Sequence, residues 1–360
     1  MAKEVRARLL GLDLVRGLAA YGVVVIHTLG NQPRTPSGVR FVGLCLGFAV
    51  PSFLAVSLYL SSGRLLLSGP SGFLRGRLER MIMPYFVWSA IFIAFRASLY
   101  LASGRADALR GLVSSPWSLL FLGKASAQLY FIPLLFLGEI LAVVIISTLG
   151  ERLKSPAWVV LFALLGVVLS WFDASRRHPL LSDPRVSDLG QVALTVGSDL
   201  LWCLPYVALA FLFQLSAVNR RMRSISGLGA LFLAAFVCAL NWIGATGAAD
   251  AYLPFGTREL VIAFGCVAAA VAVSPAVPRS RWIESLAACT FGIYLVHPLA
   301  IEASEWALTK AHVLRGGDGS AAGIALIAAV VFAESWLFVS LSMRLPILAR
   351  FLYGVRPTAR

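Results

Sequence analysis

Three ionisable residues, Asp13, Arg16 and His27, lie within the first long apolar segment of the chain, residues 10–30. Ionisable groups are costly inside a membrane, so each of them should have a partner or a function. On a helix, the eleven residues from Arg16 to His27 bring both side chains back to nearly the same face, about 16 Å apart along the axis. Asp13 lies one turn before Arg16, within contact distance of it. We expect this face to form the wall of a reaction cavity.

His27 is compatible with two interpretations. A histidine at membrane depth can be structural, neutral and hydrogen-bonded to a neighbouring group. Imidazole is also the side chain whose ordinary pKa suits proton abstraction near neutral pH. Asp13 and Arg16 share its face, and one structural histidine does not require two charged neighbours. We therefore favour a general base at this position.

A second group consists of arginines that precede the third apolar segment. Arg77 and Arg80 are three residues apart and so share a helix face, and Arg75 lies just before them. Planar guanidinium groups match phosphate oxygens, and a nearby helix N-terminus would add to the attraction. The alternative is that these arginines only anchor the segment on the cytoplasmic side, as most such clusters do. The spacing alone leaves both interpretations open.

Further polar residues lie at membrane depth in later segments. Tyr294 and His297 precede Pro298, which removes a backbone donor and can loosen the helix there. They are candidates for lining the cavity, or else for a kink with a core histidine. Tyr130 and Glu139, at the start of the fourth apolar segment and within it, are further candidates. An aromatic residue such as Tyr130 is more often part of an interfacial belt.

The elements that must position these residues are membrane-spanning helices. Of the 360 residues, 59% are hydrophobic and 13% are charged, a much lower charged fraction than in soluble domains. The sequence therefore predicts an all-α polytopic membrane protein with about ten transmembrane helices. The five cysteines fall inside apolar segments without metal-ligand spacing, so we expect buried thiols and no metal site. The segments long enough to span a bilayer are residues 10–30, 40–62, 81–103, 127–148, 156–172, 199–217, 227–244, 259–277, 284–307 and 320–343.

The distribution of basic residues predicts the orientation. The majority of the 31 lysines and arginines fall on one side of the predicted spans, which places both termini in the cytoplasm. The net charge of +14 reflects this bias, and we expect no nucleic-acid partner. The basic start followed by a long apolar run is typical of a signal anchor that is not cleaved. We expect a single integral membrane domain over residues 1–360, with no fused soluble domain.

Three motifs occur in order along the chain. They are Asp13, Arg16 and His27 in the first segment, then Arg77, Arg80, Pro84 and Tyr85 at the third, then Gly292-Ile293-Tyr294-Leu295-Val296-His297 in the ninth. This order resembles the acyltransferase-3 family of integral membrane acyltransferases, which modify sugar hydroxyls. The resemblance implies that Arg16 and His27 are the essential first-helix pair and that Arg77 and Arg80 serve the acyl-CoA site. The family pattern His-Leu-Trp-Phe is replaced here by Gln128-Leu129-Tyr130-Phe131.

The resemblance implies an O-acyltransferase of a bacterial inner membrane. It would move an acyl group, by default acetyl, from cytoplasmic acyl-CoA to a hydroxyl of a cell-envelope or exported saccharide. Acyl-CoA would be a co-substrate, and no bound cofactor is expected. The donor phosphates would meet Arg77 and Arg80, with Arg75 beside them, and the thioester would lie near His27. The side chains expected to line the acceptor side or the cavity are Tyr294, His297, Tyr130 and Glu139, with the role of Glu139 left open. Expected partners are a saccharide or glycolipid acceptor, the bilayer, and proteins of polysaccharide biosynthesis or export.

Two points of this mechanism stay open in the sequence. His27 either deprotonates the sugar hydroxyl, which we favour, or carries the acyl group briefly. Arg16 either orients His27 through Asp13 or stabilises charge that develops on the carbonyl oxygen. The rival class is a proton-coupled transporter or exporter of a lipid-linked saccharide, in which the same residues would relay protons. The arginine pair at the inner face argues against that class.

Overall fold

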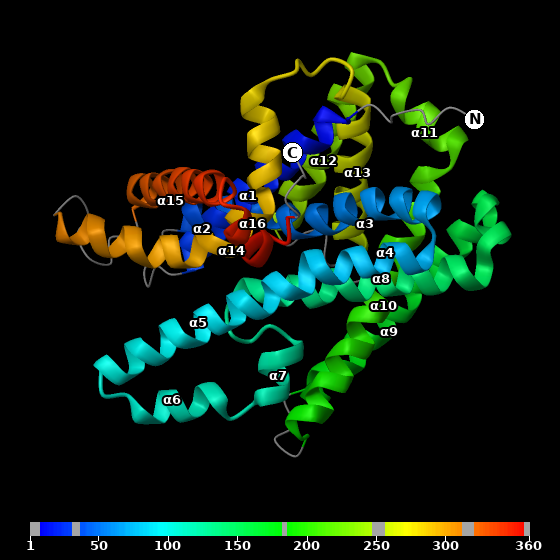
Figure 1. Ribbon diagram of the computed structural model, residues 1–360. Helices are drawn as coiled ribbons and strands as arrows, with labels where there is room; N and C mark the ends of the chain where they lie inside the picture. The colour runs from blue at the N-terminus through cyan, green and yellow to red at the C-terminus, as the bar shows by residue number, and fades with distance from the viewer. Residues whose placement is uncertain (1–7, 31–36, 182–185, 247–255, 312–319, 356–360) are drawn as a thin grey trace. The chain divides into compact units, whose positions relative to one another are not determined.

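The computed structural model describes residues 8–30, 37–181, 186–246, 256–311 and 320–355. Throughout these residues the regular structure is helical and no strand occurs (Figure 1). This confirms the all-α class predicted from the sequence. The contacts divide the chain into two compact units, each drawn from separate stretches of sequence. Helix α3 contributes residues to both units.

The first unit contains Met1–Val56, Ser216–Leu253 and Arg258–Ser340. Its helices are α1 (Leu10–Gly30), α2 (Ser37–Cys45), the short 3-10 helix η1 (Leu46–Phe48), the start of α3 (Ala49–Ser68), α11 (Ser216–Arg223), α12 (Gly227–Ala245), nearly all of α13 (Thr257–Val273), α14 (Arg281–Lys310) and most of α15 (Ala321–Ser342).

The second unit contains Ser57–Leu215, Pro254–Thr257 and Leu341–Arg360. Its helices are the rest of α3, α4 (Pro70–Arg77), the π-helical turn η2 (Leu78–Ile82), α5 (Met83–Ala102), α6 (Ala106–Val113), α7 (Pro116–Phe121), η3 (Ala127–Tyr130), α8 (Phe131–Leu149), η4 (Gly150–Lys154), α9 (Pro156–Leu181), α10 (Asp188–Gln214) and α16 (Pro346–Tyr353).

Eight helical stretches among the described residues are long and apolar enough to cross a bilayer. They correspond to eight of the ten predicted spans. The other two predictions also fall on helices, namely α9, whose apolar part is Pro156–Phe172, and α13, which has 17 residues. A polytopic membrane protein is therefore confirmed, while the count of ten and the cytoplasmic location of both termini stay predictions.

Helix α1 packs along α14 in the first unit. Contacts follow the same order on both helices, because Arg16 bonds Thr290 and, further along, His27 lies beside His297. The two helices are therefore parallel and enter the membrane from the same side. The predicted first and ninth spans require this arrangement.

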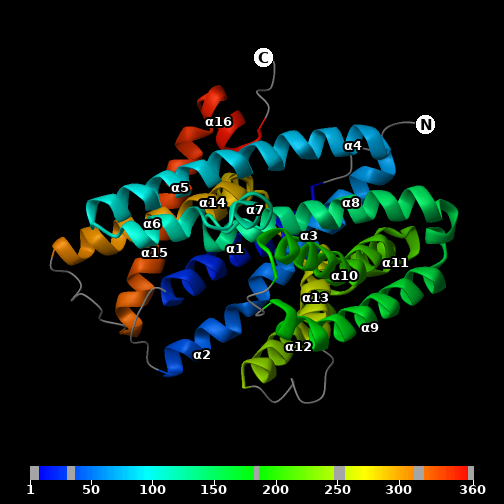
Figure 2. The ribbon, with the colours of Figure 1, turned by 90° about the horizontal axis from the view of Figure 1, so that it is seen from below.

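In the second unit α10 packs against α8 and α9, and Figures 1 and 2 show α9 running beside α10. Pro205 lies inside α10 and has no N–H to donate to the carbonyl of Leu201. The hydroxyl of Ser170, on α9, donates to that carbonyl over 2.8 Å. Gly166 allows the close approach, since a Cβ there would lie 2.6 Å from Pro205 Cδ. A side chain of α9 thus replaces the backbone hydrogen bond that Pro205 removes from α10.

A second proline shapes the start of α5. Pro84 cannot donate to the carbonyl of Arg80, and the chain adopts the wider π-helical turn over Leu78–Ile82 immediately before it. Helix α16 packs against α5, and Trp88 donates its indole N–H to a carbonyl in the last turn of α16 at 2.9 Å. Gly354 ends α16 with a φ of 64° and lies directly against the backbone of Arg80. The turn that carries Arg80 is thus supported by the C-terminal segment.

Candidate functional site

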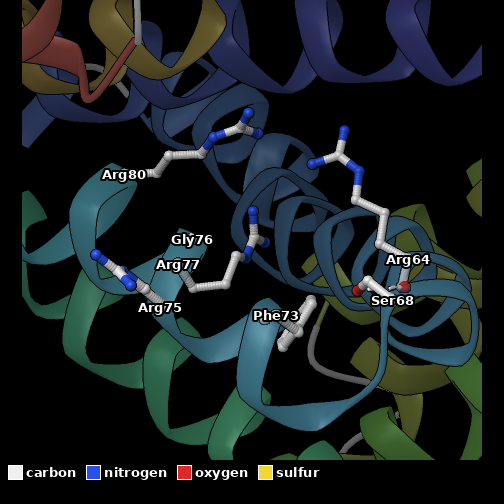
Figure 3. A pocket seen from close by; sticks show the side chains of 8 residues that line it. Arg64, Ser68, Phe73, Arg75, Gly76, Arg77 and Arg80 are labelled. Atoms are coloured by element: carbon white, nitrogen blue, oxygen red, sulfur yellow. Dashed lines mark hydrogen bonds between the residues drawn. The ribbon is translucent and has the colours of Figure 1, made fainter.

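A pocket rich in arginine opens at the corner between α3 and α4 (Figure 3). Its volume is about 500 Å³. Half of the residues that line it are arginines and none is acidic, so we call it the basic pocket. The lining residues are Arg64, Ser68, Gly72, Phe73, Arg75, Gly76, Arg77 and Arg80.

The turn between α3 and α4 builds this pocket. Helix α3 ends at Ser68, and Gly69 adopts a φ of 74°, which favours glycine. Pro70 then begins α4, where its fixed φ and missing N–H suit the first helical turn. The chain therefore changes direction within two residues, and arginines from the end of α3 and from α4 line one hollow.

Arg77 is held by a buried carboxylate. Glu139 of α8 is fully buried and accepts hydrogen bonds from Arg77 Nε, at 2.7 Å, and from Arg77 Nη2. Ser61 of α3 accepts from Arg77 Nη2 at 2.5 Å and donates to Glu139 Oε1 at 2.8 Å. The Phe73 ring lies 5.6 Å from the guanidinium carbon. This network joins α3, α4 and α8, and it neutralises the charge of Arg77.

Arg64 and Arg80 differ from Arg77 in their surroundings. Both are exposed, and neither forms an ion pair within the part of the chain that the structure describes. Figure 3 shows their guanidinium groups turned toward the hollow, whereas Arg75 points away from it. The Arg75 side chain is 85% exposed and lies 3.9 Å from Glu79. Arg64 and Arg80 therefore present the charge that is available to an anionic ligand.

The polar residues at the beginning of α1 have partners in the first unit. Asp13 accepts a hydrogen bond from Arg8 Nε at 2.6 Å, and its other oxygen lies 3.9 Å from Arg16 Nη1. Arg16 also donates to Thr290 Oγ1 at 2.8 Å. These contacts hold the N-terminal half of α1 against α14.

Two imidazoles meet at the other end of the same helix pair. The rings of His27 and His297 have centroids 4.9 Å apart and are tilted by 54°. His297 is fully buried, and the ring of Tyr294 follows at 6.1 Å. Because an imidazole ring can be neutral, such a pair places no permanent charge in the membrane.

A family match covers most of both units. Residues 9–340 match the model of a family that is described as an acyltransferase domain. The chain belongs to the acyltransferase-3 family. No curated protein and no solved structure matches it. The chain is therefore a multi-pass membrane acyltransferase, and α16 lies beyond the residues that match the family.

The structure bears on the two roles that the sequence left open for Arg16. Arg16 was expected either to orient His27 through Asp13 or to stabilise charge on the carbonyl oxygen, and the distance along α1 argues against the first. The eleven residues between Arg16 and His27 separate them by about 16 Å along α1, and Asp13 is one turn further away. Arg16 instead bonds Thr290 across the helix interface. The side chain that the structure places beside His27 is His297.

Glu139 and Tyr130 do not lie on the same helix face in this acyltransferase. Nine residues of helix separate them, which turns their side chains to opposite faces. Tyr130 is 46% exposed, whereas Glu139 is fully buried against Arg77. Glu139 was expected to line the acceptor side or the cavity, and this stays a prediction. The structure pairs its carboxylate with Arg77, which lines the basic pocket. The assignment of Tyr130 to the acceptor side stays a prediction.

Arg64 is the pocket residue that sequence reasoning missed. Its position at the end of an apolar segment is typical of residues that anchor a span on the cytoplasmic side, and this interpretation concealed it. The sequence did contain a usable signal, because Arg64 is close along the chain to the next arginines. A short turn between two spans brings the ends of those spans together. The basic pocket of the acyltransferase is thus lined by arginines from both sides of the α3–α4 turn.

Proposed function

We propose that this acyltransferase moves an acyl group, by default acetyl, from cytoplasmic acyl-CoA to a hydroxyl of a cell-envelope or exported saccharide. The membrane would be the inner membrane of a bacterium, with both termini in the cytoplasm. The observation that carries this proposal is the basic pocket, which presents Arg64 and Arg80 outside any ion pair among the described residues. An acyltransferase with such a pocket is suited to a phosphorylated acyl donor.

The pocket fits the chemistry of coenzyme A. A volume of about 500 Å³ lies within the range of pockets that bind small molecules and cofactors. Coenzyme A carries several phosphate groups, and arginine binds phosphate oxygens in a planar, two-pronged manner. Arg77 has a different role in this proposal. Because Glu139 neutralises it, Arg77 fixes α4 against α8 and thereby places the neighbouring arginines.

His27 is the proposed general base. It would take the proton of the acceptor hydroxyl while the hydroxyl oxygen attacks the thioester carbonyl carbon. A carbon–oxygen bond forms, the carbon–sulfur bond breaks, and the departing thiolate receives the proton from His27. Arg16 acts as a positioning residue in this scheme, because its bond to Thr290 holds α1 against α14.

A saccharide hydroxyl is supported as the acceptor by the family resemblance. The proposed partners are accordingly a saccharide or glycolipid and the proteins that build or export it. Tyr294 would contribute to the acceptor side, since its buried ring contacts both His297 and Phe53.

The decisive experiment supplies radiolabelled acetyl-CoA to membranes that contain the wild-type chain or His27→Ala. We expect label in saccharide with the wild type and none with His27→Ala, at equal amounts of inserted protein. A matched control is Thr28→Val, because the Thr28 hydroxyl donates to the carbonyl of Val24 in its own helix. This control should transfer label normally.

Two results would contradict the proposal. Wild-type transfer by His27→Ala would remove His27 from the chemistry. Uptake of saccharide that depends on a pH gradient, with no label transferred by the wild type, would favour the transporter class.

A further inference from the structure

His297 has a buried ring nitrogen that the proposed mechanism has not used. The side chain is fully buried on α14, and its Nε2 has no hydrogen-bond partner within the described residues. Leaving a buried acceptor without a partner is unfavourable, so such an atom calls for an explanation. The neighbouring imidazole is that of His27, with ring centroids 4.9 Å apart.

The proline that follows fixes the protonation of this ring. Pro298 lies inside α14 and lacks the N–H that would bond the carbonyl of Tyr294, four residues earlier. His297 Nδ1 lies 2.8 Å from that carbonyl oxygen and 3.3 Å from the carbonyl oxygen of Ile293. Carbonyl oxygens only accept hydrogen bonds, so Nδ1 carries the hydrogen. In the neutral ring Nε2 is then a hydrogen-bond acceptor.

We propose that His297 is the positioning residue of His27, and this inference rests on the proposed role of His27 as the base. In the reacting complex, His297 Nε2 accepts a hydrogen bond from the N–H of His27. At the observed centroid distance, rotation of the half-buried His27 ring brings a ring nitrogen within reach, and such bonds often tighten only when substrate is bound. The bond selects the His27 tautomer whose other nitrogen has its lone pair free.

This assignment gives each nitrogen of the pair one task. The free nitrogen of His27 takes the hydroxyl proton and later gives it to the departing thiolate. The other nitrogen of His27 keeps its hydrogen, bonded to His297 Nε2, and this bond stabilises the imidazolium that forms between the two steps. No proton moves to His297, because its Nδ1–H remains bonded to the carbonyl of Tyr294. The backbone of α14 thus orients the base through a single intervening ring.

The test compares His297→Gln with His297→Leu. The glutamine amide oxygen can accept a hydrogen bond near the position of Nε2, whereas leucine fills similar space without an acceptor. With radiolabelled acetyl-CoA as the donor, we expect His297→Leu to lower turnover about a hundredfold and to leave the KM for acetyl-CoA unchanged. His297→Gln should recover turnover to within about tenfold of the wild type. A purely structural role would change both variants together and would alter their thermal unfolding.

Ser304→Ala is the matched control, since Ser304 is also a buried polar residue of α14 and bonds Glu334. It should keep wild-type turnover. The inference is overturned if folded His297→Leu turns over at the wild-type rate, or if folded His297→Gln is as slow as His297→Leu. Transfer by the wild type that is lost in His27→Ala but unaffected in His297→Leu would refute this inference and leave the proposed function standing. Absence of transfer by the wild type would refute the proposed function itself.

Discussion

Arg64 and Arg80 differ from the other arginines of the basic pocket because no carboxylate pairs with them within the described residues. We expect Arg64→Gln and Arg80→Gln each to raise the KM for acetyl-CoA about tenfold, with a smaller effect on kcat. Each removes a charge-assisted bond to phosphate, and exposure keeps the loss near the lower end of the range of about 1.5–3 kcal/mol. Steady-state kinetics in membranes would measure this.

Arg75→Gln is the control for these two variants. Arg75 lines the same pocket, but its side chain points away and lies near Glu79. Its substitution should leave the KM for acetyl-CoA nearly unchanged. An equal rise of KM in all three variants would mean that only the general positive charge of the surface matters.

The ion pair of Arg77 with Glu139 should contribute to stability more than to donor binding. Arg77→Ala leaves the fully buried Glu139 carboxylate without its counter-charge, a change that typically costs about 3–5 kcal/mol. We therefore expect a clear loss of thermal stability in detergent. The double variant Arg77→Leu with Glu139→Leu should regain most of that loss, because neither charge then remains buried. Equal stability of Arg77→Ala and the wild type would show that the pair is not important for folding.

At the scale of single residues, the sequence predicted those ionisable residues that lie in or beside apolar segments. His27 was singled out because ionisable groups are rare in such segments, and the arginines near position 77 because two of them share a helix face just before a span. The partners were not predicted, since the pairing of Glu139 with Arg77 and of Arg16 with Thr290 depends on which helices pack together. That information is not contained in the spacing of residues along one helix.

At the scale of helices, three prolines act by one mechanism. Pro84, Pro205 and Pro298 each lack the N–H that would bond the carbonyl four residues earlier. The missing hydrogen bond is compensated differently in each case. A π-helical turn precedes Pro84, the Ser170 hydroxyl of another helix bonds the free carbonyl at Pro205, and the His297 side chain does so at Pro298. The sequence shows which helices contain a proline and therefore lack a hydrogen bond. It does not show which group bonds the free carbonyl, because that depends on the neighbouring side chain.

Helix α16 provides a prediction of its own. Gly354 has a left-handed φ of 64°, and a Cβ there would overlap the backbone of Arg80. We expect Gly354→Ala to push the π-helical turn away and so to raise the KM for acetyl-CoA. Gly104→Ala is the matched control, since Gly104 also has a left-handed φ, 66°, but faces open space. If both variants bind acetyl-CoA alike, α16 does not support the pocket.

At the scale of the whole molecule, the number of spans remains to be measured. With ten spans, α9 and α13 both cross the bilayer; with eight, neither does. Both counts place the start of α14 on the same side as the start of α1, as their parallel packing requires. The counts differ for α11, whose Arg220, Arg221 and Arg223 would be cytoplasmic with ten spans and external with eight. A 17-residue helix is about 26 Å long, close to the thickness of the hydrocarbon core.

A reporter fusion decides between the two counts. We expect alkaline phosphatase fused after Arg223 to be inactive, because three arginines favour the cytoplasmic side. The same enzyme fused after Ala311, beyond α14, should be active with either count and serves as the positive control. Activity of the fusion after Arg223 would support eight spans.

If His297 orients His27 as proposed, Pro298 lowers the stability of α14 and raises the rate of the reaction. Replacing Pro298 with alanine would return an N–H to the carbonyl of Tyr294 and remove a helix-breaking residue, so the melting temperature should rise. The new N–H would compete with the imidazole for that oxygen, and the ring would then be free to exchange its tautomers. The variant with the higher melting temperature would be the slower enzyme. Engineering of this protein for thermal stability should therefore leave Pro298 unchanged.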